Sequence, residues 1–585
     1  MRPSNSFVGP MLTDLYEITM AYGYWKKGKH KDNAVFDLFF RKNPFGGEFT
    51  IFAGLEEVVR SVHAFSFSDA DISFLRDGVV RQKEELRRDF EFGLKNGFIR
   101  ETSSGYEELR YDPWGTEHWE PKEYPKNDLR VPGPVRHCEP DFFGWLKSLD
   151  CSELKIYAVP EGTIVFPRIP LIRVEGPLAI AQMQETTFLN LTSFPSLIAT
   201  NAARFRLAAG QNKGLVEFGL RRAQGPDGAV SASRYSYIGG FNATSNVRAG
   251  QLFGLPTKGT MAHSYVSAFF GLDEITNPQL AGPDGKVHDF LGLVLRYRYK
   301  LGYDHTNDGE LAAFISYAQA FPDGLLALVD TYNTLESGVP NFICVALALI
   351  ETGHKPIGIR LDSGDLAYFS KETRKLLRKA AEVFSIESFG ALSILASNDI
   401  DEAILYSLAQ QGHEIDIFGI GTHLVTCRAQ PALGCVYKLV AVNGQPRIKL
   451  SDEPDKMTIP GRKEIYRLIG DDRHPVIDLM IEAGKEPPAI GERILCRHPL
   501  REAKRAYVVP KNVIPLHKCV WNGRQTFAFP PLDVIRDYVI DQISVVRPDH
   551  LRAVNPTPYK VSVSEDLYRS MHEIWMQEAP ISEIT

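Results

Sequence analysis

Between about residues 180 and 430, short apolar runs alternate with segments of helical periodicity, and this alternation constrains the fold more than any other feature of the chain. Each run is bounded by Gly or Asp, and segments such as Lys371–Phe384 and Asp401–Gln411 have the spacing of helices. Such an order is typical of β/α units that build a parallel sheet. The expected strands are Gly214–Phe218, Leu325–Val329, Ile357–Leu361, Leu392–Ala396 and Ile415–Phe418.

Every one of these runs is followed by polar, charged or glycine residues. In a β/α barrel the active site lies at the carboxyl ends of the strands. An open doubly wound sheet would place ligands at the same ends, so the pattern alone prefers neither. Because so many consecutive strand ends are polar, we favour an irregular parallel α/β barrel. The residues that follow the runs are Gly219 to Arg222, Asp330 to Asn333, Asp362 to Asp365, Ser397 to Asp399, and Gly419 to His423.

The length of 585 residues exceeds what one hydrophobic core supports, so we expect at least two domains. The barrel domain is predicted at 181–439, with an insertion at about 273–308. Residues 1–180 and 440–585 are predicted to form a mixed α+β domain, with an insertion at about 80–137. Outside the alternating region, the pattern predicts helices at 12–25, 50–62 and 564–576 and strands at 34–40 and 434–442.

Charge and composition exclude several classes of protein. With 66 Lys and Arg against 72 Asp and Glu, the net charge is −6, which does not suit a basic nucleic-acid clamp. The longest clean apolar run, Phe342–Ile350, is too short to span a membrane. No signal peptide is recognisable, and the seven cysteines include no C-x-x-C pair. We therefore expect a cytosolic protein with reduced cysteines that binds neither nucleic acid nor membranes.

The strand ends offer candidate ligands for phosphate. The loop Gly419–His423 is glycine-rich and follows the last apolar run, where barrels often hold phosphate groups; an ordinary tight turn is the alternative. Carboxylates together with phosphate are the usual ligands of Mg²⁺, although Asp is also a common helix N-cap. The carboxylates at the strand ends are Asp330, Asp362, Asp365 and Asp399.

Cationic groups lie near the same strand ends. Arg221, Arg222 and Arg360 can offer a planar fork to carboxylate or phosphate. Arg221 and Arg222 could instead form surface salt bridges. Arg360 lies at the end of an apolar strand, so a solvated surface position is not expected for it. His263 follows a turn of small residues, and a structural role is its alternative. The sequence contains no H-E-x-x-H motif and no Walker A loop, so no protein-held zinc site is indicated.

Taken in order, these motifs closely resemble the nicotinate phosphoribosyltransferase family. The likeness runs from about residue 10 to past 440, although the two predicted insertions look longer than the family pattern. Any single segment would be a weak signal, whereas the ordered set is specific. The segments are MLTDLYEITMAYGYW (11–25), EFGLRRAQGPDG (217–228), YIGGFNATSNVRAG (237–250), GTMAHSYV (259–266), VDTYNT (329–334), RLDSGDL (360–366), ASNDI (396–400) and FGIGTHLVT (418–426).

The resemblance implies that nicotinate and phosphoribosyl pyrophosphate react to give nicotinate mononucleotide and pyrophosphate, coupled to ATP hydrolysis. That reaction is the first step of NAD synthesis from nicotinate. The family further implies Mg²⁺, held mainly through substrate phosphates, and ATP as co-substrate. It also implies an α/β barrel beside a mixed domain, and a head-to-tail homodimer with the active site at the subunit interface.

The resemblance also assigns roles to individual residues. His263 is the residue that ATP would phosphorylate. Arg360 and Asp362 would act at the pyrophosphate, the ribose hydroxyls or Mg²⁺. The nicotinate ring would lie between Phe218 and a Tyr16 of the partner subunit. The remaining implied substrate-binding residues are Arg221 near the carboxylate, Gly421 and Thr422 at the 5′-phosphate, Asn398 and Asp399 beside ribose and phosphate, and Ser264, Asp330 and Asn246.

Asn246 bears on the choice of substrate. Related enzymes that use nicotinamide carry an arginine like Arg221 but an Asp where this chain has Asn246. A carboxylate there would accept an amide N–H and repel nicotinate, so Asn246 favours the acid. The alternatives are a nicotinamide-using relative and a non-catalytic relative, and the latter would have lost motif residues that this chain retains.

Overall fold

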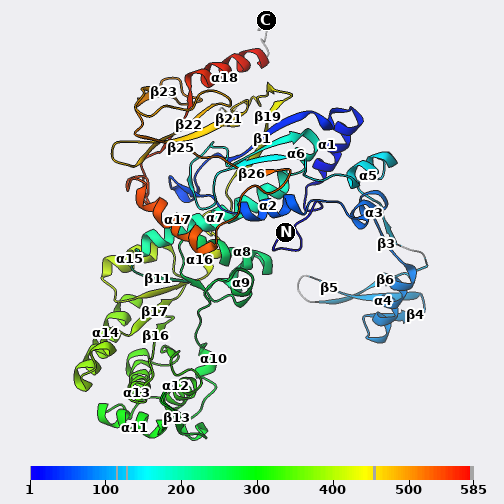
Figure 1. Cartoon of the computed structure of the whole chain (residues 1–585). Coiled ribbons are helices and arrows are strands. Elements are labelled where there is room, and N and C mark those ends of the chain that lie inside the picture. The colour runs from blue at the N-terminus through cyan, green and yellow to red at the C-terminus, as the bar shows by residue number, and fades with distance from the viewer. Residues whose placement is uncertain (1, 113–115, 127–128, 452, 454–455, 580–585) are drawn as a thin grey trace.

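The computed structural model describes residues 2–112, 116–126, 129–451, 453 and 456–579. Parts of the two segments predicted as the mixed domain therefore lie outside the described residues. Within the described part, the protein is built mainly from three six-stranded sheets with helices packed on them (Figure 1).

One sheet is parallel throughout, with the strand order β12-β11-β18-β17-β16-β15. All five apolar runs form strands of this sheet, so the prediction of a parallel α/β unit is confirmed. The runs are apolar on both faces because helices cover the sheet. The bounds are β11 (Gly214–Glu217), β12 (Ala243–Thr244), β15 (Leu326–Leu328), β16 (Gly358–Leu361), β17 (Ser393–Ser397) and β18 (Ile417–Ile420), with α14 (Leu366–Phe384) and α15 (Glu402–Gln411) between strands.

The irregular barrel predicted from the sequence is not confirmed. Within the described residues β12 and β15 are the edges of the parallel sheet, and no strand pairing joins them. The chain between these edges does not continue the β/α alternation, because it forms mainly helices and one small hairpin. These elements are α9 (Val247–Phe253), α10 (His263–Val266), β13 (Gln279–Ala281), β14 (Val287–Asp289), α11 (Phe290–Leu301) and α12 (Asp308–Ala320).

A second, antiparallel sheet combines strands from both ends of the chain in the order β20-β19-β1-β10-β8-β26. Its central strand β1 (Asn33–Phe40) pairs with β10 on one side and with β19 on the other. In β1, Asp37 is buried and forms an ion pair of 2.8 Å with the buried Lys463. The other strands are β8 (Lys155–Ala158), β10 (Ile172–Pro177), β19 (Cys435–Val442), β20 (Gln445–Pro446) and β26 (Lys518–Asn522).

The third sheet comes entirely from the C-terminal part and has the order β24-β23-β27-β22-β21-β25. Helix α18 (Glu565–Glu578) packs on this sheet and confirms the predicted C-terminal helix, whereas α17 (Leu532–Val545) packs on α8 (Gly225–Ile238). The strands are β21 (Lys463–Ile469), β22 (Pro475–Glu482), β23 (Ile494–Arg497), β24 (Arg505–Val508), β25 (Asn512–Pro515) and β27 (Lys560–Ser564).

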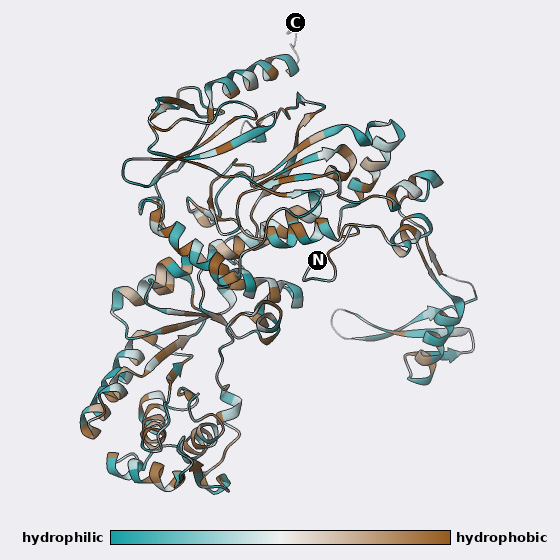
Figure 2. Cartoon of the chain, viewed as in Figure 1, coloured by the Kyte–Doolittle hydropathy of each residue, from teal (hydrophilic) through white to brown (hydrophobic). Residues whose placement is uncertain are grey.

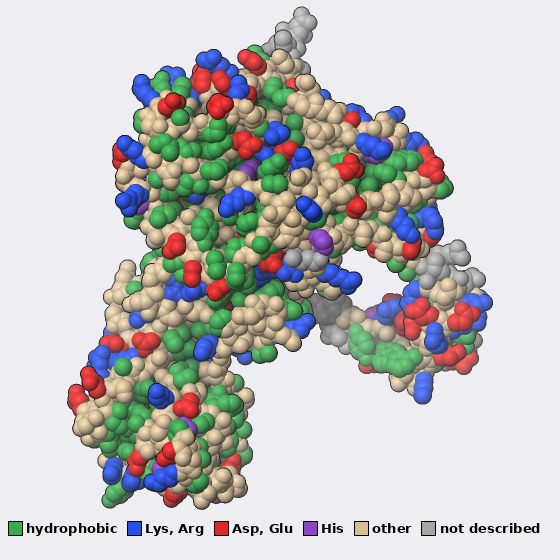
Figure 3. Space-filling model, in the orientation of Figure 1, with side chains coloured by type: hydrophobic (Ala, Val, Ile, Leu, Met, Phe, Trp, Pro, Cys, Tyr) green, Lys and Arg blue, Asp and Glu red, His purple; other side chains and the backbone are tan. Residues whose placement is uncertain are grey.

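The predicted insertion at about 80–137 forms a small lobe that stands away from the body of the protein (Figures 1 and 3). Its buried residues include Phe90 and Ile99, and residues 113–115 and 127–128 of it lie outside the described part. The lobe contains β3 (Val79–Arg81), α4 (Lys83–Lys95), β4 (Ile99–Thr102), β5 (Gly105–Tyr111), β6 (Glu117–Lys122) and β7 (Leu129–Val131), and α3 (Asp69–Asp77) and α5 (Pro140–Lys147) lie at its base.

The helix predicted at 50–62 begins later than expected. Thr50–Ile51 form the short strand β2, which pairs with β9 (Ile164–Val165). Helix α2 (Leu55–His63) then starts after Gly54, whose φ of 100° is a conformation that favours glycine. The first helix, α1 (Leu15–Lys26), lies within the predicted range apart from its last residue.

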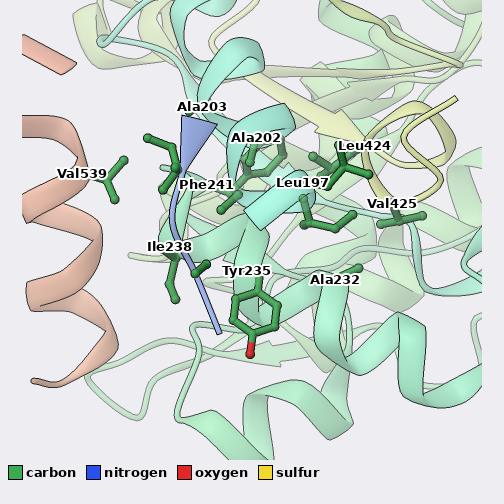
Figure 4. Packing of buried hydrophobic residues seen from close by; sticks show 14 of the residues in the cluster. Leu197, Ala202, Ala203, Ala232, Tyr235, Ile238, Phe241, Leu424, Val425 and Val539 are labelled. Carbon is green, nitrogen blue, oxygen red and sulfur yellow. The ribbon is translucent and has the colours of Figure 1, made fainter. Parts of the chain in front are cut away.

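Helix α7 (Glu185–Ala209) links the antiparallel and parallel sheets through its small residues. It packs on α8 (Gly225–Ile238), and Ala202, Ala232 and Ile238 belong to the same apolar cluster (Figure 4). On its other side, the Thr200 hydroxyl accepts a hydrogen bond of 2.8 Å from the Ile51 amide. Figure 2 shows the apolar residues concentrated in the strands and on the inner faces of the helices.

One stretch of the described chain, Thr334–Glu351, is long and apolar enough to pass a length-and-composition test for membrane spans. It includes helix α13 (Val339–Glu351), and 78% of it is buried inside the protein. A buried core helix passes the same test, and α13 packs on α11 and α12 in this way.

Candidate active site

A cavity of about 460 Å³ lies at the carboxyl ends of β11, β16, β17 and β18. This volume is within the range of small-ligand sites. Residues 259–262, which precede α10, close one side of it. Most of the residues predicted from the strand ends line this cavity, namely Phe218, Arg221, Arg222, Arg360, Asp362, Asn398, Asp399, Gly421 and Thr422, together with Ser397 and Gly419.

Arg360 is held in a defined position at the end of β16. Its Nε donates a hydrogen bond of 2.9 Å to Ser397 Oγ, and its Nη2 donates one of 2.9 Å to Asp362 Oδ1. The Ser397 hydroxyl also donates to Asp362, which closes a small ring of hydrogen bonds. The guanidinium lies 5.3 Å from the centre of the Phe218 ring. Since a guanidinium has five N–H donors, Arg360 keeps donors for an anion in the cavity.

Glycine at position 419 lets the Phe218 ring approach β18 closely. A Cβ at Gly419 would lie 2.4 Å from two atoms of that ring. At Gly421 a Cβ would lie 3.1 Å from the Phe218 carbonyl. The two glycines therefore allow Phe218 to pack closely against the end of β18. The adjacent Glu217 is buried and accepts hydrogen bonds from the hydroxyls of Ser233 and Thr244 at 2.8 and 2.5 Å.

Asn398 and Asp399 have unusual backbone conformations at the end of β17. Their φ angles are 144° and 41°, which residues with side chains rarely adopt. Such conformations each cost about 1–3 kcal/mol and concentrate at ligand sites. Both residues line the cavity, and the Thr422 hydroxyl donates to Asp399 at 3.4 Å. The backbone therefore directs two polar side chains of one loop toward the same space.

Helix α7 fixes the loop that follows β18. The Asn201 side-chain amide donates hydrogen bonds of 3.0 Å to the carbonyls of His423 and Leu424, at the short helix α16 (Thr422–Val425). The Leu424 and Val425 side chains pack into the same apolar cluster as α7 (Figure 4). Hydrogen bonds and apolar contacts with α7 therefore hold the glycine-rich loop in position.

His263 lies beside this cavity, at the start of α10. Its Nε2 is 3.1 Å from Asp330 Oδ1, and the side chains of His263 and Asp330 are 46% and 2% exposed. The other oxygen of Asp330 accepts hydrogen bonds from the Asp362 amide at 2.9 Å and from the Ser363 hydroxyl at 2.6 Å. Because an ionised carboxylate only accepts, we assign the His263 proton to Nε2, which leaves the lone pair on Nδ1. Asp330 therefore connects His263 to the Arg360 loop.

Glu310 lies behind Asp330 on α12 and is fully buried. Burial raises the pKa of Glu310 to about 7, and the charge of Asp330 adds to the rise. Hydrogen bonds from Ser337 Oγ at 2.6 Å and Asn341 Nδ2 at 3.1 Å act in the opposite direction. A second carboxyl group near the His263–Asp330 pair therefore changes its charge close to neutral pH.

Five predicted site residues do not line the cavity: His263 and Asp330, which lie beside it, and Asn246, Ser264 and Tyr16. Asn246 is buried, its Nδ2 donates to Ser233 Oγ at 3.1 Å, and its Oδ1 caps α9 by accepting from the Ala249 amide at 3.2 Å. Ser264 is exposed next to His263. Tyr16 lies on α1, 43% exposed. Their predicted roles stay predictions.

The described residues contain no group of three or more His, Cys, Asp or Glu side chains that could hold a metal ion. Asp362 is bound to Arg360 and Ser397, whereas Asp399 lines the cavity and, among the described residues, has the Thr422 hydroxyl as its one hydrogen-bond partner. The donor set therefore suits Mg²⁺ only when substrate phosphates provide further oxygens, as the ion commonly requires.

Sequence reasoning did not assign functions to some residues that shape the site. Ser397 was predicted only as a polar residue that follows an apolar run, yet it bridges Arg360 and Asp362. Glu217 was part of a quoted motif without a role, although a buried carboxylate at a strand end is itself a signal. Ser363 was predicted only as a polar strand-end residue, and its contact with Asp330 was not predictable because 33 residues separate the two.

Comparison with known proteins gives one consistent result. A model described as the nicotinate phosphoribosyltransferase N-terminal domain matches residues 11–94 and 125–193. The family model of the same name matches residues 352–482, and the model of its C-terminal domain matches residues 462–571. The chain is 50% identical to a nicotinate phosphoribosyltransferase of Dictyostelium discoideum, over 100% of this chain and 91% of that protein. It is 41% identical to the Homo sapiens protein of that name, over 98% of this chain and 97% of that protein.

The fold agrees with these matches. A crystal structure of human nicotinic acid phosphoribosyltransferase superposes with a TM-score of 0.77 at 39% identity, covering 96% of this chain and 99% of that one. The ordered motifs, the cavity at the strand ends and the full-length likeness lead to the same conclusion: the chain belongs to the nicotinate phosphoribosyltransferase family.

Proposed function

We propose that this chain transfers the phosphoribosyl group of phosphoribosyl pyrophosphate to nicotinate, forming nicotinate mononucleotide in NAD biosynthesis. The names of its full-length relatives support this activity. The observation that carries the proposal is the single cavity in which Arg360, Asp399 and Thr422 meet an aromatic ring, Phe218. Such a cavity combines groups for an anionic sugar phosphate with a surface for a flat ring.

The nicotinate ring would lie against Phe218, whose position is fixed by Gly419 and by the Arg360 guanidinium. An aromatic face restricts a flat ring to one plane. Arg221, which is exposed at the rim of the cavity, would bind the nicotinate carboxylate as a planar fork. Tyr16 would come from a partner subunit, which makes a homodimer with a shared site part of the proposal.

At the other end of the cavity, Gly421 and Thr422 would bind the 5′-phosphate, and Asn398 and Asp399 the ribose and phosphate. The position of Gly421 and Thr422 at the start of the short helix α16, on the cavity lining, supports this assignment. The strained loop at residues 398–399 gives these side chains a fixed direction before the substrate arrives.

Transfer breaks the bond between the ribose anomeric carbon and pyrophosphate while the nicotinate nitrogen bonds to the same carbon. Negative charge grows on the leaving pyrophosphate, and Arg360 is positioned to stabilise it. Losing one such preorganised donor costs about 2.7–4 kcal/mol of transition-state stabilisation. Mg²⁺ bound through the substrate phosphates, with Asp362 or Asp399 nearby, would neutralise part of the same charge.

His263 would accept the γ-phosphoryl group of ATP. Its Nδ1 lone pair attacks phosphorus, the bond to the leaving ADP breaks, and a nitrogen–phosphorus bond forms. The contact between Nε2 and Asp330 supports this role, because it holds the ring in the tautomer whose free nitrogen is Nδ1. Through Asp330, a change at His263 reaches the Asp362 amide and hence the Arg360 loop.

The proposal is tested by measuring nucleotide formation from labelled nicotinate and labelled nicotinamide in one competition assay, with Mg²⁺ and with or without ATP. We expect preference for nicotinate and stimulation by ATP. Preference for nicotinamide would overturn the acid assignment and the role given to Asn246. No turnover of either substrate by folded protein would support a non-catalytic relative. The cytosol, which we propose as the compartment, is tested separately by fractionation.

A further inference from the structure

A second cavity, of about 680 Å³, lies in the C-terminal part of the protein, away from the parallel sheet. One face of the sheet that contains β22 and β23, at the top of Figure 1, forms its floor. The strand register places Ile477 opposite Lys560 and Cys496 opposite Ala506, so four neighbouring strands contribute to the floor. Glu48, Pro167 and Arg168 from the N-terminal part close it from the other side.

The lining of this cavity is strongly basic in a chain whose net charge is −6. The turn between β23 and β24 contributes Arg501 and Lys504, β24 contributes Arg505, β27 contributes Lys560, and Arg168 faces them from the other side. Within the described chain, no carboxylate lies within 4.0 Å of Arg501, Lys504, Arg505 or Lys560. Such a concentration of like charge in a hollow favours an anion.

Two further observations indicate a built site. Arg168 has a φ of 73°, a conformation that is uncommon for residues other than glycine and that places it at the cavity wall. The turn is ordered internally: His498 Nδ1 accepts hydrogen bonds of 3.1 Å from the amides of both Leu500 and Arg501. The single acidic side chain of the lining is Glu48, and burial raises the pKa of Glu48, which weakens its repulsion of an anion.

The apolar part of the lining narrows the choice of anion. The Tyr559 ring is stacked on Phe166 with ring centres 3.5 Å apart, and Ile477, Pro167 and Pro558 lie beside it. A rigid apolar wall opposite several cations suits a ligand that has both a flat ring and phosphates. We propose that this cavity is a binding site for a nucleoside polyphosphate, separate from the catalytic cavity.

The location is tested by photolabelling the full chain with 8-azido-ATP and mapping the labelled peptides. We expect label in residues 498–506 or 558–562 in addition to any label near the catalytic cavity. The label in those peptides should be competed by unmodified ATP and absent from the variant R501A/K504A/R505A. Label confined to peptides of the catalytic cavity would overturn the proposal.

Affinity is tested by calorimetric titration with ATP. The wild type should show two binding events per chain, and R501A/K504A/R505A should lose one of them or weaken it at least tenfold. The control R473A/K485A/K511A removes three exposed cations of the same region outside the cavity and should keep both events. Nucleotide formation measured without ATP should be unchanged in both variants, which shows that they are folded. Two unaltered events in the first variant would refute the site, whatever the substrate of the catalytic cavity.

Discussion

Replacement of Asp330 by Asn tests the most specific part of the proposed mechanism. The Asp330 side chain is 2% exposed and accepts hydrogen bonds from His263, the Asp362 amide and Ser363. Asn has nearly the same shape but only one acceptor oxygen. If that oxygen stays with the Asp362 amide and Ser363, an NH₂ group faces His263 Nε2. The imidazole must then move its proton to Nδ1, the nitrogen that should attack phosphorus.

The expected magnitude follows from the hydrogen bond that is lost. A hydrogen bond to a charged group contributes about 1.5–3 kcal/mol. At about 1.36 kcal/mol for each factor of ten, phosphorylation of His263 should slow roughly 10- to 150-fold. Transfer measured without ATP should change much less, because Arg360 and the cavity lining are untouched. The burial of Asp330 argues for the upper part of this range.

The assay is the rate of acid-labile, alkali-stable incorporation of label from γ-labelled ATP, with nucleotide formation measured in parallel. Asp365→Asn is a matched control, because Asp365 is exposed in the same loop and caps α14 by accepting from the Tyr368 amide, which Asn also does well. Incorporation in Asp330→Asn within twofold of this control would refute the tautomer argument.

Three further predictions follow from the site. Arg360→Ala should reduce kcat/KM for phosphoribosyl pyrophosphate by at least 100-fold, the lower end of about 2.7–4 kcal/mol, with an unchanged unfolding midpoint; near-normal kinetics would remove Arg360 from the mechanism. Gly419→Ala places a Cβ 2.4 Å from the Phe218 ring and should raise KM for nicotinate; an unchanged KM would separate that ring from the substrate. Burial raises the pKa of Glu310 from 4.5 to about 7, so the free energy of unfolding falls by up to about 3 kcal/mol as pH rises from 4.5 through 7. In Glu310→Gln, the free energy of unfolding by urea should depend less on pH between pH 5 and 8. An equal dependence on pH in both proteins would contradict this.

The parallel sheet could be predicted because its strands are buried on both faces and are therefore apolar without interruption. The strand β12 escaped prediction since it has only two residues, Ala243 and Thr244, too few to form a pattern. Barrel closure, which the structure does not confirm, could not be decided from the sequence because a barrel and an open sheet both place polar residues at strand ends. Only the pairing of edge strands distinguishes them, and the helices α10 to α12 between β12 and β15 decide that pairing.

Site residues that follow strands were predictable for the same topological reason, since parallel strands end at one edge. The hydrogen bond between His263 and Asp330 was not, because 67 residues separate the two in sequence. The buried position of Asn246 was also hidden: its role as an N-cap of α9 depends on where that helix begins. An Asp at 246 would compete with Glu217 for the Ser233 hydroxyl, so the residue at this position affects the buried network behind the cavity.

The most direct test of the whole account is a crystal structure of this chain with nicotinate mononucleotide. The account predicts the pyridine ring on Phe218, the 5′-phosphate at Gly421 and Thr422, and the ribose beside Asp399. Nicotinate mononucleotide bound only elsewhere, with Arg360 and the loops after β17 and β18 free of contact, would contradict it.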